Sequence, residues 1–218
     1  MNPELRTIET QDWITIVILL GLLVFVLGKY FYQTRFINFI VLPFNNKYIF
    51  LYGKKGKWAS SFNIFMSVFQ LLNYALFLFL AQQLFFDNVR NNGPMLFLVI
   101  LGVLVTFHIL KITMQLAKAY IFNTKKLVFN IMFNKLSYFN HSSIFVFISN
   151  ILLVYVFYGS KSVVYITILM VLAINLIGFT NLLKNHQKLI LGHLFYFILY
   201  LCALEIAPLV ILGSYLKD

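Results

Sequence analysis

The stretch WITIVILLGLLVFVLGKYF, Trp13 to Phe31, decides the fold class of this chain. It is almost wholly apolar up to Lys29, and an apolar run of roughly 18 residues or more is typical of a helix that crosses a membrane. No basic segment precedes the run, and Lys29 and Tyr30 follow it in place of a small-residue cleavage site. We therefore expect a retained membrane span rather than a signal peptide that is removed.

The composition extends this interpretation to the whole chain. Of its 218 residues 61% are hydrophobic and only 11% are charged, whereas a soluble domain carries about 25% charged residues. Further apolar runs follow the first, so the sequence predicts a single all-α domain, a polytopic membrane helical bundle with six transmembrane helices. The predicted spans are 13–31, 61–86, 95–116, 143–158, 163–182 and 189–212.

The loops between these spans divide the charges unevenly. One set of loops, with the adjoining span ends, holds 13 of the 17 Lys and Arg residues and no acidic residue, while the other set holds four basic and five acidic residues. Lys and Arg accumulate on the cytoplasmic side of membrane proteins. We therefore predict that both termini lie outside and that loops 32–60 and 117–142 are cytoplasmic. The basic residues expected to face anionic lipid or a partner there are Lys47, Lys54, Lys55, Lys57, Lys125, Lys126, Lys135, Lys184 and Lys188.

Both predicted cytoplasmic loops contain amphipathic segments of their own. In the first loop, Pro43 and the pair Asn45-Asn46 predict a turn after the apolar run TRFINFIVL. In the second loop, polar residues recur at helical spacing, which predicts a helix that lies in the inner headgroup layer. These residues are Asn123, Lys126, Asn130, Asn134 and Ser137.

One carboxylate, Glu205, interrupts the last predicted span in LYLCALEIAPL, Leu199 to Leu209. The helical rise places it ~24 Å from the cytoplasmic edge of that span. Pro208 removes a backbone donor three residues later and should kink the helix. Three roles stay open for Glu205: a proton or cation relay, an anchor for a basic group of a partner, and a structural pair with Arg90 or Lys161.

Two histidines are also predicted inside the membrane. By the same helical rise His108 lies ~12 Å and His193 ~6 Å from the cytoplasmic edge, so the two imidazoles could approach each other. Two facing histidines could ligate a haem iron, bind another metal or carry protons, but most intramembrane histidines hydrogen-bond a neighbouring helix. Lys111, near the end of the same span as His108, is expected to extend its ammonium to the headgroups.

Four amide side chains are predicted near mid-membrane: Gln70, Asn73, Asn150 and Asn175. Such side chains commonly bond across helices and hold a bundle together. We favour this role over a substrate path, because transporters more typically show paired acids or helices broken by Gly or Pro in both halves.

Sequence signals for an enzyme are weak. The chain contains no GxSxG, HExxH, P-loop or GxGxxG motif, and its membrane spans contain a single carboxylate. Its one cysteine, Cys202, offers no metal-ligand pattern. We predict no catalytic residue, no metal site and no cofactor, with haem as the one exception left open.

Two motifs carry a resemblance, VLPFNNKYIFLY at Val41 to Tyr52 and LYLCALEIAPL near the C-terminus. In these motifs and over most of its length the chain resembles an uncharacterised family of integral membrane proteins from Bacteroidota, known as a domain of unknown function. The resemblance implies a bacterial inner-membrane location, and it implies no activity.

These observations lead to an expectation about function. We expect a non-enzymatic inner-membrane subunit or accessory factor of a larger envelope complex, such as one for export or assembly, with membrane lipids and other membrane subunits as its partners. The basic loops show no RNA-binding fold, so no nucleic acid is expected. The alternatives are a small proton-coupled transporter that uses Glu205 and the buried polar residues and, more weakly, a haem-binding protein that uses His108 and His193.

Overall fold

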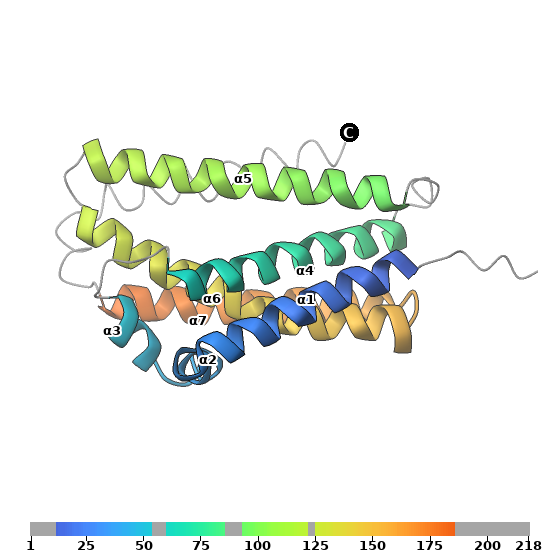
Figure 1. The fold of residues 1–218 in the computed structure, drawn as a ribbon, viewed down its shortest axis with the longest axis horizontal. Helices are drawn as coiled ribbons and strands as arrows, with labels where there is room; N and C mark the ends of the chain where they lie inside the picture. Colours follow the sequence, from blue (N-terminus) through green and yellow to red (C-terminus); the bar gives the residue numbers. More distant parts are fainter. Residues whose placement is uncertain (1–11, 54–59, 86–92, 122–124, 186–218) are drawn as a thin grey trace, which may run out of the picture. The chain divides into compact units, whose positions relative to one another are not determined.

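A computed structural model describes residues 12–53, 60–85, 93–121 and 125–185. These residues form α1 (Asp12–Phe31), α2 (Gln33–Ile40), α3 (Lys47–Gly53), α4 (Ser61–Phe85), α5 (Gly93–Ile121), α6 (Lys125–Ile151), the π-helical segment η2 (Leu152–Val156) and α7 (Lys161–Asn185) (Figure 1). No strand occurs in them, so the predicted all-α class is confirmed. The chain divides into two compact units, Met1–Gly178 and Phe179–Asp218, and apart from the last turns of α7 the described helices belong to the first.

Five of the described helices are long and apolar enough to cross a membrane. They are Asp12–Phe31, Ser61–Phe85, Gly93–Ile121, Val128–Val156 and Lys161–Lys184. Each overlaps one of the first five predicted spans. The sixth predicted span, 189–212, lies outside the described residues.

Helix α6 differs most from the sequence expectation. It begins at Lys125, within the predicted cytoplasmic loop 117–142, and continues without a break through most of the predicted fourth span. No Gly or Pro interrupts it before Ile151, so nothing in its backbone chemistry stops the helix. The chain then turns at Gly159, whose φ of 75° favours glycine, before α7 begins.

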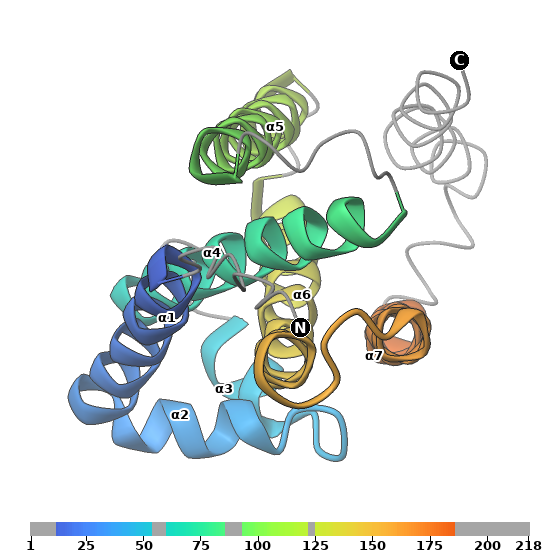
Figure 2. The ribbon, with the colours of Figure 1, turned by 90° about the vertical axis from the view of Figure 1, so that its right-hand side faces the viewer.

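Helix α4 is central to the first unit, because it packs against α1, α5 and α6 (Figure 2). Between α1, α4 and α5 the Trp13 ring contacts Phe79 and Phe97, with centroids 5.0 and 5.5 Å apart. A second apolar cluster joins Phe77 of α4 to Leu153 of η2 and Val164 of α7. Helix α5 runs between α4 and α6 in sequence, so α4 and α6 point in the same direction.

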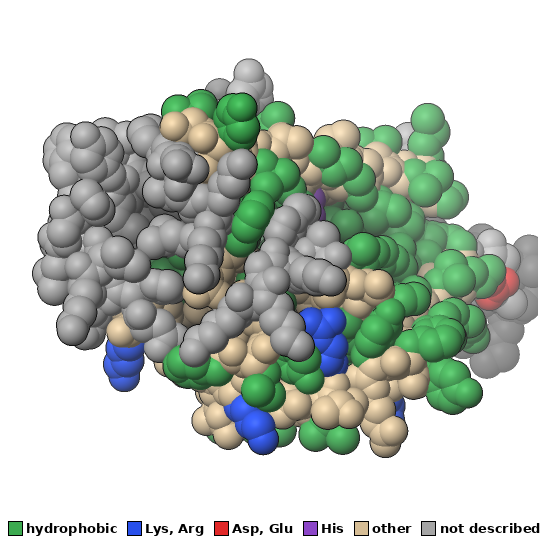
Figure 3. All heavy atoms as spheres, turned by 60° about the vertical axis from the view of Figure 1, so that its left-hand side comes forward, with side chains coloured by type: hydrophobic (Ala, Val, Ile, Leu, Met, Phe, Trp, Pro, Cys, Tyr) green, Lys and Arg blue, Asp and Glu red, His purple; other side chains and the backbone are tan. Residues whose placement is uncertain are grey.

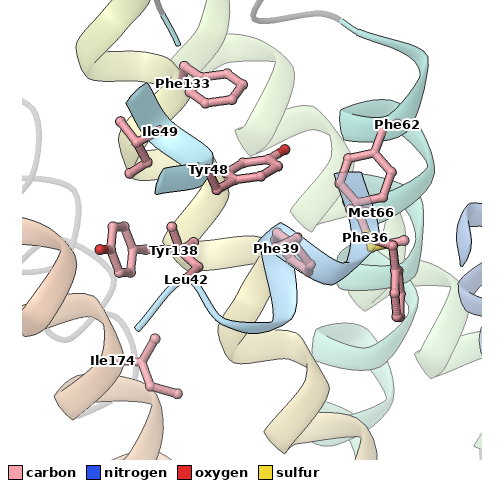
Figure 4. Packing of buried hydrophobic residues seen from close by; sticks show 10 residues of the cluster. All are labelled: Phe36, Phe39, Leu42, Tyr48, Ile49, Phe62, Met66, Phe133, Tyr138 and Ile174. Carbon is pink, nitrogen blue, oxygen red and sulfur yellow. The ribbon is translucent and has the colours of Figure 1, made fainter. Parts of the chain in front are cut away.

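The predicted first loop is folded back onto the bundle. Helices α2 and α3 and the turn between them bury one face of large side chains against α4 and α6 (Figure 4). The buried residues of this face are Phe36, Phe39, Leu42, Tyr48 and Ile49, and they meet Phe62, Met66, Phe133 and Tyr138. The turn falls at Pro43 and Asn45-Asn46, where the sequence predicts it.

Much of the described surface is apolar. Figure 3 shows hydrophobic side chains over a wide area of one face, with a few separate Lys and Arg side chains along its lower part. Large exposed apolar residues occur on α1, α5 and α7 in particular. Such surface is what helices in contact with hydrocarbon present, and it agrees with a protein embedded in a membrane.

Candidate functional site

The interface between α4 and α6 contains six of the 13 buried polar side chains in the described part of the chain. On α4, Asn63, Ser67, Gln70 and Asn73 recur every three or four residues and so share one helix face. That face is turned toward α6, and Gln70 and Asn73 are only 1% and 3% exposed. In hydrocarbon such groups need partners inside the protein, because no water is at hand.

Three hydrogen-bonded pairs of residues link the two helices. Asn150 Nδ2 donates to the backbone oxygen of Asn73 over 3.0 Å, and Asn140 Nδ2 donates to Ser67 Oγ over 3.4 Å. A third hydrogen bond of 2.7 Å joins the hydroxyls of Tyr74 and Ser142. We call these groups the polar seam, and it comprises Ser67, Gln70, Asn73 and Tyr74 of α4 with Asn140, Ser142, Ser143 and Asn150 of α6.

Several acceptor atoms at or near the polar seam have no hydrogen-bond partner among the described residues. Within the seam they are Gln70 Oε1, Asn140 Oδ1 and Asn150 Oδ1. Asn134 Oδ1 and His141 Nδ1 on α6 share this property. Burying an acceptor without a partner costs about 1–3 kcal/mol, so these atoms are the most unusual feature of the bundle interior.

A second group of polar contacts holds α2 and α3 in place. Tyr48 donates its hydroxyl to Asn63 Oδ1 over 3.0 Å, and Tyr138 donates to Asn46 Oδ1 over 2.9 Å. His141 Nε2 lies 3.1 Å from the backbone oxygen of Ile40, an acceptor, so this nitrogen carries the proton. Burial raises the pKa of the Tyr48 hydroxyl far above its ordinary value, which keeps it a donor at any physiological pH.

Replacing Tyr48 by phenylalanine tests whether the hydrogen bond from Tyr48 to Asn63 stabilises the protein. We expect Tyr48→Phe to lower the free energy of unfolding by about 1–2 kcal/mol, because it removes the donor from Asn63 Oδ1 in a buried site. The matched control is Tyr155→Phe, which removes an exposed hydroxyl bonded to Thr15 Oγ1. Unfolding in mixed detergent micelles measures both variants, and equal losses would contradict a specific role for Tyr48.

The structure brings together three of the four predicted amide residues. Gln70, Asn73 and Asn150 all lie in the polar seam, and Asn73 and Asn150 are in direct contact. Asn175 stands apart on α7, where its Nδ2 donates to the backbone oxygen of Val171 in its own helix. Asn73 likewise donates to Phe69 one turn earlier, so part of the amide chemistry serves single helices.

The other predicted intramembrane residues are only partly described. His108 and Lys111 lie on α5, and both side chains are half-buried. Glu205, His193 and Pro208 lie outside the described residues, so the predicted approach of His193 to His108 and the kink beside Glu205 are not addressed. Within the described ranges no three His, Cys, Asp or Glu side chains gather where they could hold a metal ion.

The predicted basic residues fall into three groups. Lys47 and Lys184 are exposed, and Lys135 is half-buried. Lys125 and Lys126 stand in the first turn of α6. Lys54, Lys55, Lys57 and Lys188 lie outside the described residues.

Two residues of the amphipathic stripe predicted for loop 117–142 are turned inward. Asn134 and Ser137 are 3% and 2% exposed, whereas a helix in the headgroup layer would present them to solvent. The reason is α3, which packs on this face of α6 and stacks the Tyr48 ring on Phe133. Polar periodicity alone does not distinguish a face that meets water from one that meets another polar helix.

The sequence analysis did not single out Asn140, His141, Ser142 or Tyr74. The available signal was the cluster NHSS at Asn140 to Ser143, just before the predicted fourth span. Such a cluster at the start of a span indicates either an interfacial cap or a buried polar site. A further polar contact joins α6 to α7, where the hydroxyls of Ser149 (α6) and Thr167 (α7) are hydrogen-bonded at 2.6 Å.

Comparison with known proteins adds a family to this description. No curated protein and no solved structure matches the chain. One family model does match, and it covers residues 14–216, which is nearly the whole chain. The chain therefore belongs to the family described as domain of unknown function DUF4271.

Proposed function

We propose that this protein is a non-enzymatic inner-membrane subunit or accessory factor of a larger bacterial envelope complex. In this proposal it has six spans, both termini outside and its basic ends in the cytoplasm, against anionic lipid. The observation that carries the proposal is helix α5, which is long enough to cross a membrane and buries few of its residues in the described part of the chain. Only 6% of its most apolar stretch is buried.

The two faces of α5 differ in the size of their side chains rather than in polarity. The face toward α4 and α6 includes Phe97, Leu104 and Gln115, of which Phe97 and Gln115 are buried. The opposite face is formed by Gly102, Thr106, Ile109, Thr113 and Ala117, all exposed and spaced by three or four residues. We call it the outer stripe of α5.

The outer stripe of α5 suits close contact with another transmembrane helix. Small residues spaced four apart let two backbones approach, and this packing drives helix association where lipid removes the hydrophobic effect. A Cβ atom placed on Gly102 would meet nothing within 4 Å. The hydroxyls of Thr106 and Thr113 donate to backbone oxygens of their own helix, so the stripe presents small, satisfied surfaces.

The proposal predicts that bulk on the outer stripe of α5 separates the protein from its partner. A photo-crosslinking amino acid at Ile109 in the native membrane should form a product with a transmembrane segment of another polypeptide. Gly102→Leu should reduce that product about 5- to 150-fold, since bulk forced into a close helix contact costs roughly 1–3 kcal/mol. The matched control Val103→Leu, at a neighbouring exposed position on α5, should retain it.

Two outcomes would overturn the proposal. A crosslink from position 109 to residues 189–212 of the same chain would assign the outer stripe to the chain's own last predicted span. Crosslinks to lipid alone would make α5 an ordinary lipid-facing helix. Neither outcome depends on the stability of a variant, because both are read from the chain with its natural Gly102.

Proton-coupled transport is the second candidate, and the unpartnered acceptors of the polar seam favour it. In this case Glu205→Gln should abolish proton uptake into vesicles while the protein still accumulates in the membrane. Failure of the variant to accumulate would instead support a structural ion pair at Glu205.

A further inference from the structure

Three amide oxygens follow one another along the polar seam without a donor. Gln70, Asn140 and Asn150 are 1%, 2% and 0% exposed, and one side-chain oxygen of each has no partner among the described residues. Exchanging the amide nitrogen and oxygen of Asn150 would not give its oxygen a donor. Its nitrogen donates to the backbone oxygen of Asn73, which can only accept.

The register of the two helices places these oxygens in a row. Asn140 is paired with Ser67 and Asn150 with Asn73, and Gln70 stands midway between Ser67 and Asn73 on α4. Ser67 and Asn73 are about 9 Å apart along the helix axis. On α6 the paired residues Asn140 and Asn150 are about 15 Å apart along the helix axis, so the acceptors share one face of the α4–α6 interface but are too far apart for a single water.

Apolar residues flank this stretch in both directions along the helices, joined on the side of α3 by the buried polar residues Asn63 and Asn134. On the side of α3, Phe62 and Phe133 belong to the cluster that also buries Tyr48. Beyond Asn73 and Asn150, Phe77 and Leu153 belong to the cluster with Val164. No hydrogen-bond donor is found for the three oxygens among the described residues, so a bound molecule is the candidate donor.

The chemistry of the seam selects that molecule. The unpartnered atoms are acceptors, so the ligand must donate hydrogen bonds, and an anion is excluded. Asp12, exposed at the start of α1, is the only acidic residue in the described part of the chain, so nothing there offsets the charge of a buried cation. A neutral donor remains, and water is the smallest molecule with two donors that reaches every membrane protein.

The helical backbone becomes irregular just beyond the seam, in the segment that contains Leu153. Two residues after Asn150 the helix widens into the π-helical segment η2, where Phe157 N donates to Leu152 O. π-helical segments occur frequently at functional sites. In membranes, irregular backbone is tolerated where it is buried in protein or lines a hydrated space.

We propose that the middle of the α4–α6 interface binds water inside the membrane, with Gln70, Asn140 and Asn150 as its acceptors. The bound water completes the hydrogen bonding of the polar seam and forms a hydrated site between two apolar layers. The assignment is independent of any partner protein, since all its ligands belong to this chain.

Solid-state NMR of the isotope-labelled full chain in phospholipid vesicles tests the assignment. The experiment measures transfer of water magnetisation to the side-chain amides of Gln70, Asn140 and Asn150. We expect transfer as fast as at Asn45, which is exposed in the turn between α2 and α3. Transfer as slow as at the backbone amides of Phe77 and Leu153 would show a dry seam and overturn the proposal.

A pair of variants tests whether the three acceptors are joined by one connected group of waters. Gln70→Leu should slow the transfer at Asn140 and Asn150, whereas Asn175→Leu on α7 should leave it unchanged. Unchanged transfer in a folded Gln70→Leu protein would overturn a shared site. If that variant does not fold, the measurement on the natural chain still decides whether the seam is hydrated.

Discussion

Phe39→Ala is expected to lower the free energy of unfolding by about 3–5 kcal/mol, the usual range for truncating a fully buried phenylalanine. Phe39 is 1% exposed, and its ring contacts those of Tyr48, Phe62 and His141 with centroids 5.5 to 5.7 Å apart. Truncation leaves a cavity between α2, α4 and α6 that these rings cannot all move to fill. The size of the loss measures how firmly α2 and α3 are part of the bundle.

The matched control is Phe44→Ala, five residues away in the same segment. Phe44 is 92% exposed, so its truncation should change the free energy of unfolding by no more than about 0.5 kcal/mol. Both variants can be followed in a Trp58→Phe background by the fluorescence of Trp13, which packs on Phe79 in a separate cluster. Similar small losses in the two variants would mean that α2 and α3 lie on the bundle surface without contributing to its stability.

The long apolar helices could be predicted from the sequence because a membrane span is a local property. Length and hydropathy alone locate α1, α4, α5 and α7 to within a few residues of their observed ends. Helix α6 was divided because NHSS, at Asn140 to Ser143, looks like the polar edge of a span. In the structure these residues lie inside the helix and turn toward α4 and α2, where polar partners replace water.

For the candidate site, the sequence predicts some of the residues but not which of them pair. Gln70, Asn73 and Asn150 were identified because an amide inside an apolar run is conspicuous. Their pairing depends on the register of α4 against α6, and the bond from Asn150 to Asn73 spans 77 residues of sequence. The hydrogen bond from Tyr48 to Asn63 could not be predicted for a different reason. A tyrosine in an apolar loop does not indicate whether its ring faces lipid or a neighbouring helix.

The second large effect on stability is expected at Gly178, where α7 approaches Tyr138 of α6 closely. A Cβ atom at Gly178 would lie 2.5 Å from Tyr138 Cγ and 2.9 Å from Tyr138 Cβ, distances at which something must move. Tyr138 cannot easily yield, because its ring is 1% exposed and its hydroxyl donates to Asn46. We therefore expect Gly178→Ala to cost about 1–3 kcal/mol through overpacking.

The control variant for this prediction is expected to become more stable rather than less. Gly102→Ala on α5 meets nothing within 4 Å, so the purified protein should gain roughly 0.5–1 kcal/mol from the better helix propensity of alanine. Unfolding of the two variants in the same micelles compares them directly. If Gly178→Ala were as stable as Gly102→Ala, α7 would not approach Tyr138 closely. The Tyr138 to Asn46 bond would then hold the turn between α2 and α3 without support from α7.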